Sequence, residues 1–326
     1  MRRLRWLSLG LAALVMLLLA PTLWREREQL LSFEWHIAPL WLVFAGLMHA
    51  VTMGWSFLVW HLTVRRLAGI AAPGLRADFS IYYTTLLARR IPGSVWYAAG
   101  CVWLYERTGV GRSVTLAALV LEAAIIFVSG IVFFLGLLPL ADSGENRLLP
   151  LLASIPPWLP PLGIVAGLVV LWPGVLERLI NRVRAWRQLD PLRFNVGYLD
   201  LVVWVGLTLI VWLAAGLGFY GVVRFVYPAP LTDLAPLLLI STISILVGFI
   251  SFLLPFIPLA KEFAMSLLLA AFVPLPVAIV VTILYRVVWT ACDALWALLA
   301  GHFGNVALLE PDPTVAGESV SPATQP

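Results

Sequence analysis

Charged side chains are scarce in this chain of 326 residues. Asp, Glu, Lys and Arg make up 12% of it, whereas soluble domains carry about 25%. Lysine is almost absent. Of the 21 lysine and arginine residues, Lys261 is the single lysine and the other twenty are arginines. Hydrophobic residues reach 62% and the mean hydropathy is +0.98. This composition excludes an ordinary soluble domain and predicts a protein embedded in a membrane.

Cysteine and histidine are also rare, which excludes several kinds of site. Cys101 and Cys292 both lie in apolar surroundings and cannot form a disulfide framework. The four histidines lack the spacing of metal ligands. No serine has a histidine and an acid close by in the sequence, and no phosphate-binding loop of the ATPase type is present. We therefore expect no metal, no cofactor and no enzymatic activity.

The arginines are concentrated in short loops between apolar runs, so the net charge of +4 does not indicate a nucleic-acid partner. Cytoplasmic loops of membrane proteins carry an excess of basic residues. We expect an inner (plasma) membrane protein with its N-terminus and both basic loops in the cytoplasm. The first loop, 62–78, holds Arg65, Arg66 and Arg76, and the second, 177–195, holds Arg178, Arg182, Arg184, Arg187 and Arg193.

Long apolar runs predict an all-α polytopic helix bundle, because a membrane-spanning helix needs about 20 apolar residues. The N-terminal run is longer than that of a signal peptide and lacks a cleavage site, so we expect it to be retained. We expect residues 1–305 to form the membrane domain and 306–326 to form a disordered polar tail. We expect about 7–8 spans in total, some of them from the two irregular segments 79–101 and 255–273. The clear spans are 5–23, 37–62, 113–140, 149–175, 198–226, 232–253 and 275–300.

The segment 79–101 is apolar but irregular, because Arg89 and Arg90 lie in its middle, followed by Ile-Pro-Gly. If it crossed the bilayer, the two basic loops would lie on opposite sides. A hairpin that enters and returns places both loops on one side. Such backbone is tolerated only where protein or a water-filled cavity satisfies its polar groups. We therefore predict a re-entrant hairpin beside a polar cavity.

A second irregular segment, 255–273, resembles the first and indicates a weak internal repeat. The stretches 91–122 and 257–286 each begin with Ile-Pro, continue as a short apolar segment, break at a turn (109–111 and 274–276) and lead into a long helix with an ionisable residue. Transporters are often built from such repeats, and the broken segments mark their binding sites. The repeat matches Glu122 with Arg286, whose charges could meet across its interface. The helix-breaking residues are Pro92, Gly93, Pro255 and Pro258.

Ionisable side chains within apolar segments usually face the bundle interior or a water-filled path. Arg89, Arg90 and Lys261 are candidates for binding phosphate, since both residue types recognise it. Neighbours on a helix do not face each other, so we expect Lys261 and Glu262 to have separate partners, a lipid phosphate for Lys261 and Arg286 for Glu262. Alternatively, these groups pair only among themselves, and the two arginines extend to the surface. The remaining candidates form a buried polar network: Glu122, Glu262, Arg286 and Asp293.

The sequence Arg-Arg-Ile-Pro-Gly-Ser-Val-Trp, followed by Gly-Val-Gly and Val-Leu-Glu122, resembles the first signature of a known family. The proline-rich break with Glu262 and Ile-Leu-Tyr-Arg286 is similar to its second signature. This family is the lysylphosphatidylglycerol synthase transmembrane-region family of flippase-like proteins. The resemblance implies a bundle of about eight helices with re-entrant elements. The matching positions are Pro92, Gly93, Gly109, Glu122, Glu262 and Arg286.

Two functions follow as hypotheses. The first is translocation of an anionic amphipathic lipid, a phospholipid or polyprenyl-phosphate conjugate, through a polar intramembrane cavity. The second is a non-transporting scaffold that docks a soluble lipid-modifying or glycosyl-transferring enzyme through the loop 177–195. Membrane lipids are the expected partners, with a second copy of the chain or a soluble enzyme as further candidates.

Overall fold

The computed structural model describes residues 25–90, 95–141, 156, 158–170, 172–186, 196–253 and 260–303, and every element in them is helical. The expected first span 5–23 and the polar tail lie outside these residues. The helices are α2 (Arg27–Ser32), α3 (Leu40–Ala68), η1 (Gly69–Ala71), α4 (Leu75–Leu86), η2 (Leu87–Arg90), α5 (Val95–Glu106), α6 (Arg112–Ala141), α8 (Leu159–Val170), α9 (Pro173–Trp186), α10 (Tyr198–Val226), η3 (Leu231–Asp233), α11 (Leu234–Leu253), α12 (Ala260–Leu269) and α13 (Leu275–Phe303).

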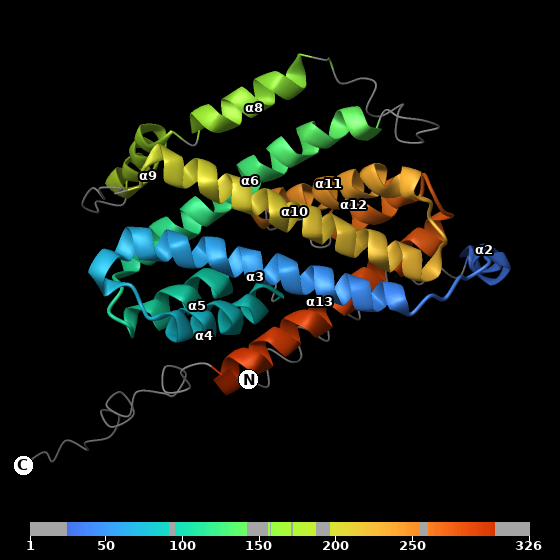
Figure 1. Cartoon of the computed structure of the whole chain (residues 1–326), viewed down its shortest axis with the longest axis horizontal. Coiled ribbons are helices and arrows are strands. Elements are labelled where there is room, and N and C mark those ends of the chain that lie inside the picture. The colour runs from blue at the N-terminus through green and yellow to red at the C-terminus, as the bar shows by residue number, and fades with distance from the viewer. Residues whose placement is uncertain are drawn as a thin grey trace, which may run out of the picture.

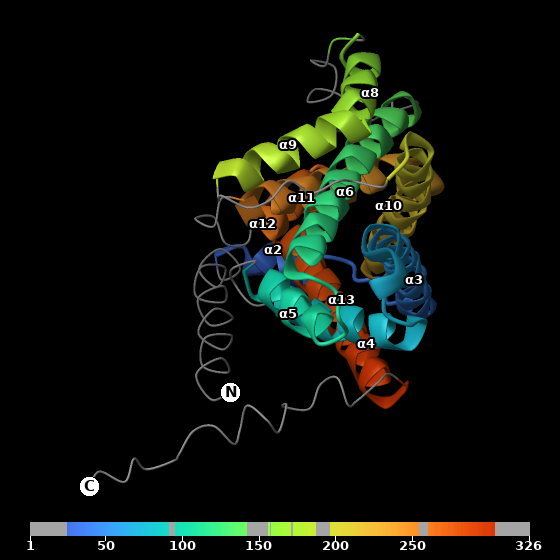
Figure 2. The same cartoon turned by 90° about the vertical axis from the view of Figure 1, so that its left-hand side faces the viewer.

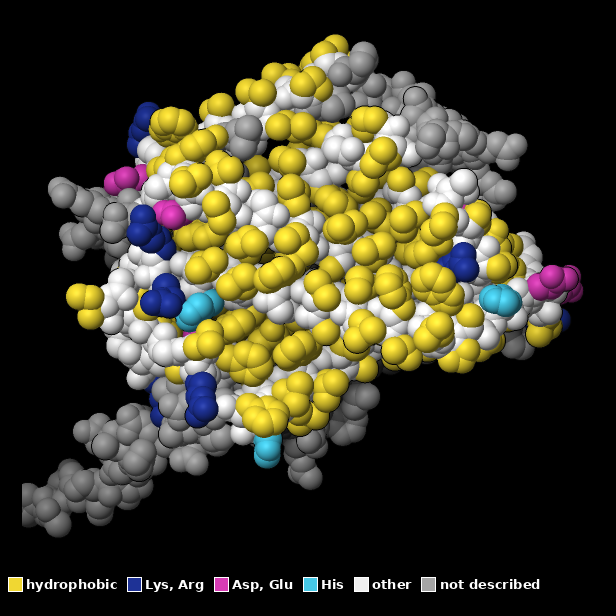
Figure 3. Space-filling view, in the orientation of Figure 1, with side chains coloured by type: hydrophobic (Ala, Val, Ile, Leu, Met, Phe, Trp, Pro, Cys, Tyr) yellow, Lys and Arg dark blue, Asp and Glu magenta, His cyan; other side chains and the backbone are white. Residues whose placement is uncertain are grey.

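Among the described residues, five helical stretches are long and apolar enough to cross a membrane: Leu40–Ala71, Arg112–Leu140, Tyr198–Val226, Leu231–Phe249 and Leu275–Phe303. Large apolar side chains face outward along them, including Val43, Leu47 and Leu298. Soluble proteins rarely expose apolar surface on this scale. In the view of Figure 3, apolar side chains cover the middle of the molecule and charged ones gather toward its two ends. These features support an integral membrane protein.

Helices α3 and α10 pack antiparallel along the length of the bundle (Figure 1). At one end, Arg66 of α3 forms an ion pair with Asp200 of α10, with 3.0 Å between Nε and Oδ2. At the other end, the amide of His36 donates to the carbonyl oxygen of Val226. We call the first the basic end, because Arg65, Arg66, Arg107 and Arg112 all lie at it. The opposite end is called the far end.

The unit α4–α5–α6 starts at the basic end. Asp78, near the start of α4, accepts a hydrogen bond from Tyr105, near the end of α5, so these two short helices run antiparallel. The chain then turns at Gly109, whose φ of +89° favours glycine. This is the turn that the sequence predicted. From Arg112, α6 runs toward the far end (Figure 1). The view from the basic end in Figure 2 shows α6 rising from α5 to α8.

The unit α11–α12–α13 has the same order of elements but starts at the far end. Leu234 of α11 and Leu269 of α12 both pack in the buried cluster that contains Val226. Helix α13 starts beyond them, and its Ala300 packs with Val64 near the basic end of α3. The two units therefore run in opposite directions through the bundle.

The segment 149–175 differs from the single span that its composition predicted. The structure has α8 over Leu159–Val170, and these 12 residues extend only about 18 Å. Pro173 then opens α9, a second helix, as proline does at a first helical position. Part of the loop expected at 177–195 is therefore helical. On α9, Arg178 and Arg182 are both exposed and lie one turn apart.

Gly218 of α10 allows a close approach of α13. A Cβ atom added at this position would overlap the indole ring of Trp289. Gly218→Ala should therefore lower the free energy of unfolding by about 1–3 kcal/mol, as overpacked cores do. Thermal unfolding of the purified protein in detergent measures the change. The control is Gly206→Ala on the same helix, where the added atom meets nothing within 4 Å. Equal destabilisation by both substitutions would contradict the packing described.

Candidate functional site

An ion pair joins α12 to α13 near the middle of the membrane helices. Nη1 of Arg286 lies 2.9 Å from Oε1 of Glu262, so the expected contact between these residues is present. Arg286 lies three residues before Trp289, the middle residue of α13, and thus about 4.5 Å from the helix centre. Both side chains remain partly exposed, 37% for Arg286 and 29% for Glu262. The pair is therefore open to whatever fills the space beside α12 and α13.

A second contact lies one residue earlier on both helices. Nζ of Lys261 stands 5.3 Å from the centre of the Tyr285 ring, a cation–π arrangement. Gly248 of α11 permits this packing, since a Cβ atom there would lie 3.0 Å from Cβ of Lys261. Lys261 thus interacts with an aromatic face rather than with Glu262, as expected for adjacent positions on a helix. The interface between α12 and α13 carries two cations and one carboxylate.

Asp293 lies two turns beyond Arg286 on α13 and pairs with a residue that the sequence had not singled out. Its Oδ1 is 2.9 Å from Nε2 of His49 on α3, and both residues are almost fully buried. Trp289 packs edge-on against the imidazole ring, with ring centres 4.8 Å apart. Histidine and aspartate in contact can hold or release a proton. Near the centre of a span, such a pair is a candidate for proton coupling.

Glu122 lies on α6, in the unit α4–α5–α6, which runs in the opposite direction to the unit that contains Arg286. Its Oε2 accepts a hydrogen bond from the hydroxyl group of Tyr97 on α5, at 3.2 Å, and the residue is 8% exposed. Among the described residues, Arg286 pairs with Glu262 and not with Glu122, so the charges matched by the repeat do not meet. The four residues predicted to form a buried polar network make three contacts: Glu122 with Tyr97, Glu262 with Arg286, and Asp293 with His49. The side chains of Arg89 and Arg90 and the residues Pro92, Gly93, Pro255 and Pro258 lie outside the described residues.

A buried polar chain at the basic end was not predicted from the sequence. Nδ1 of His61 on α3 lies 2.5 Å from Oδ2 of Asp78, which is completely buried. The hydroxyl group of Tyr105 donates to the other carboxylate oxygen and accepts from the indole N–H of Trp60 at 2.6 Å. Burial raises the pKa of Tyr105 well above its usual value, and the charge of Asp78 raises it further. Tyr105 therefore stays a neutral donor.

The sequence indicates this buried polar chain only weakly. His61 lies in the expected span 37–62, where histidine is rare and usually functional. Asp78 is the last residue of the expected loop 62–78, where an acidic side chain is ordinary. No family model matches the sequence, and neither a curated protein nor a solved structure with significant similarity to the chain was found.

Proposed function

We propose that this protein moves an anionic amphipathic lipid between the two leaflets of a membrane. The observation that carries the proposal is the partly exposed ion pair between Glu262 and Arg286 near the middle of α13. A charge at the centre of the bilayer costs about 2.5–3.5 kcal/mol on insertion scales. Exposure of two such charges to lipid tails is therefore unfavourable, and exposure to a hydrated path is not. A hydrated path beside α12 and α13 would accommodate a polar headgroup.

The arrangement of the two three-helix units supports this proposal. In each unit a short helix precedes a long one, and the third residue of the short helix, Tyr97 or Glu262, contacts the long helix. The units run in opposite directions, as in the inverted repeats of many transporters. We propose that α4–α5 and α11–α12 are the re-entrant or broken elements of this repeat. Their substrate path would lie at the level of Glu122 and Arg286.

The charges indicate the class of lipid. Lys261 and Arg286 can attract a phosphate, and arginine can bind it through two hydrogen bonds. Glu262 can then release Arg286 to the phosphate and accept an amine or a hydroxyl group of the headgroup. This exchange of partners favours phospholipids or polyprenyl-phosphate conjugates over neutral lipids. We further propose that the basic end faces the cytoplasm, in accordance with the distribution of arginines.

Purified protein in liposomes tests the proposal. Liposomes carry headgroup-labelled fluorescent phosphatidylglycerol in both leaflets, and dithionite added outside destroys only the exposed label. We expect the protein to convert the half-bleached signal of empty liposomes into nearly complete bleaching. Labelled lipids with a neutral or zwitterionic headgroup should move more slowly. Equal bleaching with and without protein for several anionic headgroups would overturn the proposal for those lipids.

The exposed arginines of α9 favour one second candidate, a scaffold for a soluble enzyme. Arg178 and Arg182 would then contact the partner. Replacing both with glutamine should abolish co-purification of that partner, and the wild-type protein should not speed lipid movement in liposomes. A translocator without such a partner moves lipid at the same rate before and after the replacement and loses no co-purifying protein.

A further inference from the structure

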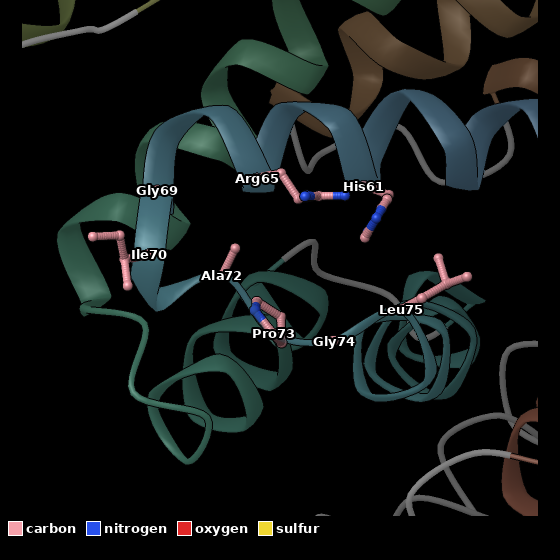
Figure 4. A pocket seen from close by; sticks show the side chains of 8 residues that line it. All are labelled: His61, Arg65, Gly69, Ile70, Ala72, Pro73, Gly74 and Leu75. Carbon is pink, nitrogen blue, oxygen red and sulfur yellow. The ribbon is translucent and has the colours of Figure 1, made fainter.

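A cavity lies at the basic end, where α3, η1 and the start of α4 form a corner. Its volume is about 430 Å³, within the range of small-molecule sites. Figure 4 shows Arg65 and His61 extending from α3 toward this space, with Gly69, Gly74 and Leu75 among the residues around it. The cavity is remote from Glu262 and Arg286, so it is distinct from the proposed lipid path.

Arg65 provides the positive charge of this cavity. Its neighbour Arg66 is paired with Asp200. Arg65 is exposed, lines the cavity and forms no ion pair with any described residue. A guanidinium group that lines a cavity without a carboxylate partner is suited to bind a phosphate through two parallel hydrogen bonds.

His61 contributes a second polar group, and Asp78 fixes its orientation. A carboxylate only accepts hydrogen bonds, so the Nδ1 atom of His61 carries the proton of the 2.5 Å contact. Tyr105 donates to the other oxygen of Asp78, which satisfies the carboxylate and reduces its repulsion of an anion. The ring is thereby held with Nε2 as the nitrogen that remains for a ligand.

The start of α4 adds backbone donors to the same cavity. Gly74 precedes the helix without any side-chain cap, so the first N–H groups have no side-chain acceptor. Gly74 and Leu75 both line the cavity. The positive end of a helix with uncapped N–H groups favours an anion. The arginine, the oriented histidine and the start of the helix thus converge on one space.

From these three features we infer that the cavity binds a phosphate ester, with Arg65 as its principal ligand. Arg65 forms two hydrogen bonds with phosphate oxygens, and the α4 N–H groups contact a third. Nε2 of His61, which carries no proton when Nδ1 donates to Asp78, accepts a hydrogen bond from a hydroxyl group of the phosphate or of the esterified group. The phosphate can belong to a lipid headgroup or to a soluble phosphate compound, and both share this chemistry. The inference does not depend on lipid translocation.

Calorimetric titration of the full chain in uncharged detergent tests this inference. The probes are dihexanoyl phosphatidylglycerol, glycerol 3-phosphate and inorganic phosphate. We expect Arg65→Gln to weaken binding of the bound probes about ten-fold or more, equivalent to about 1.4 kcal/mol, because a charge-assisted pair of hydrogen bonds is lost. The matched control is Arg76→Gln, which removes an exposed arginine of α4 that does not line the cavity. It should change the affinity less than about two-fold, because surface charges contribute little.

Each outcome has a definite meaning. Selective loss with Arg65→Gln supports the site, and unchanged thermal unfolding of the variant excludes misfolding as the cause. Binding of the lipid alone assigns a membrane lipid as the source of the phosphate, and binding of all three probes assigns a soluble phosphate compound. Equal weakening by Arg65→Gln and Arg76→Gln shows diffuse attraction to a basic surface and overturns the inference. So does failure of the wild-type protein to bind any probe.

Discussion

Asp78→Ala is expected to lower the free energy of unfolding by about 3–5 kcal/mol, the range found when one member of a buried charged pair is removed. Asp78 is completely buried and accepts hydrogen bonds from both His61 and Tyr105. Alanine leaves both donors buried without an acceptor, and Tyr105 then retains only its bond from Trp60. Loss of these hydrogen bonds also loosens the packing of α4 and α5 against α3.

Unfolding in detergent, followed by tryptophan fluorescence, measures this effect. Glu106→Ala is the control, because Glu106 also pairs across a short distance, 2.7 Å from Nε of Arg112, but both side chains are exposed. Exposed ion pairs contribute about 0–1 kcal/mol. Asp78→Asn should fall between the two, since it keeps one acceptor oxygen. Equal losses of unfolding free energy in Asp78→Ala and Glu106→Ala would show that the buried hydrogen bonds of Asp78 do not stabilise the bundle.

Glu262→Gln is expected to slow lipid translocation in liposomes about ten-fold or more, equivalent to about 1.4 kcal/mol in the barrier. Glutamine keeps the volume of the side chain but cannot neutralise Arg286, whose guanidinium lies near the middle of α13. An uncompensated charge at that depth binds the lipid phosphate too tightly for release, or closes the hydrated path. Arg286→Ala removes the cation and should slow the same step.

Glu106→Gln is the matched control for this prediction. It breaks an ion pair of similar length at the exposed end of α5, outside the proposed path. The control should translocate lipid at the wild-type rate, measured at equal protein density per liposome. If Glu262→Gln translocates lipid at the same rate as Glu106→Gln, the ion pair between Glu262 and Arg286 takes no part in translocation.

Much of the fold followed from the length of the apolar runs. The spans expected at 113–140, 198–226 and 275–300 agree closely with α6, α10 and α13, because crossing a bilayer requires a minimum helix length. The same argument was wrong at 149–175, where Pro173 starts a new helix. Apolar composition alone does not report where a helix ends.

The candidate site was predictable in part. Two opposite charges in consecutive apolar segments have few partners available, which made the contact between Glu262 and Arg286 foreseeable. The pair of His49 and Asp293 joins residues 244 positions apart, and no local pattern reports such a distance. Asp78 was missed because its role depends on three helices meeting.

Exchange of the charged pair tests the central claim most directly. The rates of phosphatidylglycerol translocation are compared among Glu262→Arg, Arg286→Glu and the variant that carries both substitutions. Each single reversal places two like charges together and should reduce translocation to the rate of empty liposomes. The double variant restores an ion pair between α12 and α13 and should recover a substantial part of the wild-type rate. Folded single reversals that translocate lipid as fast as the wild type would contradict the account.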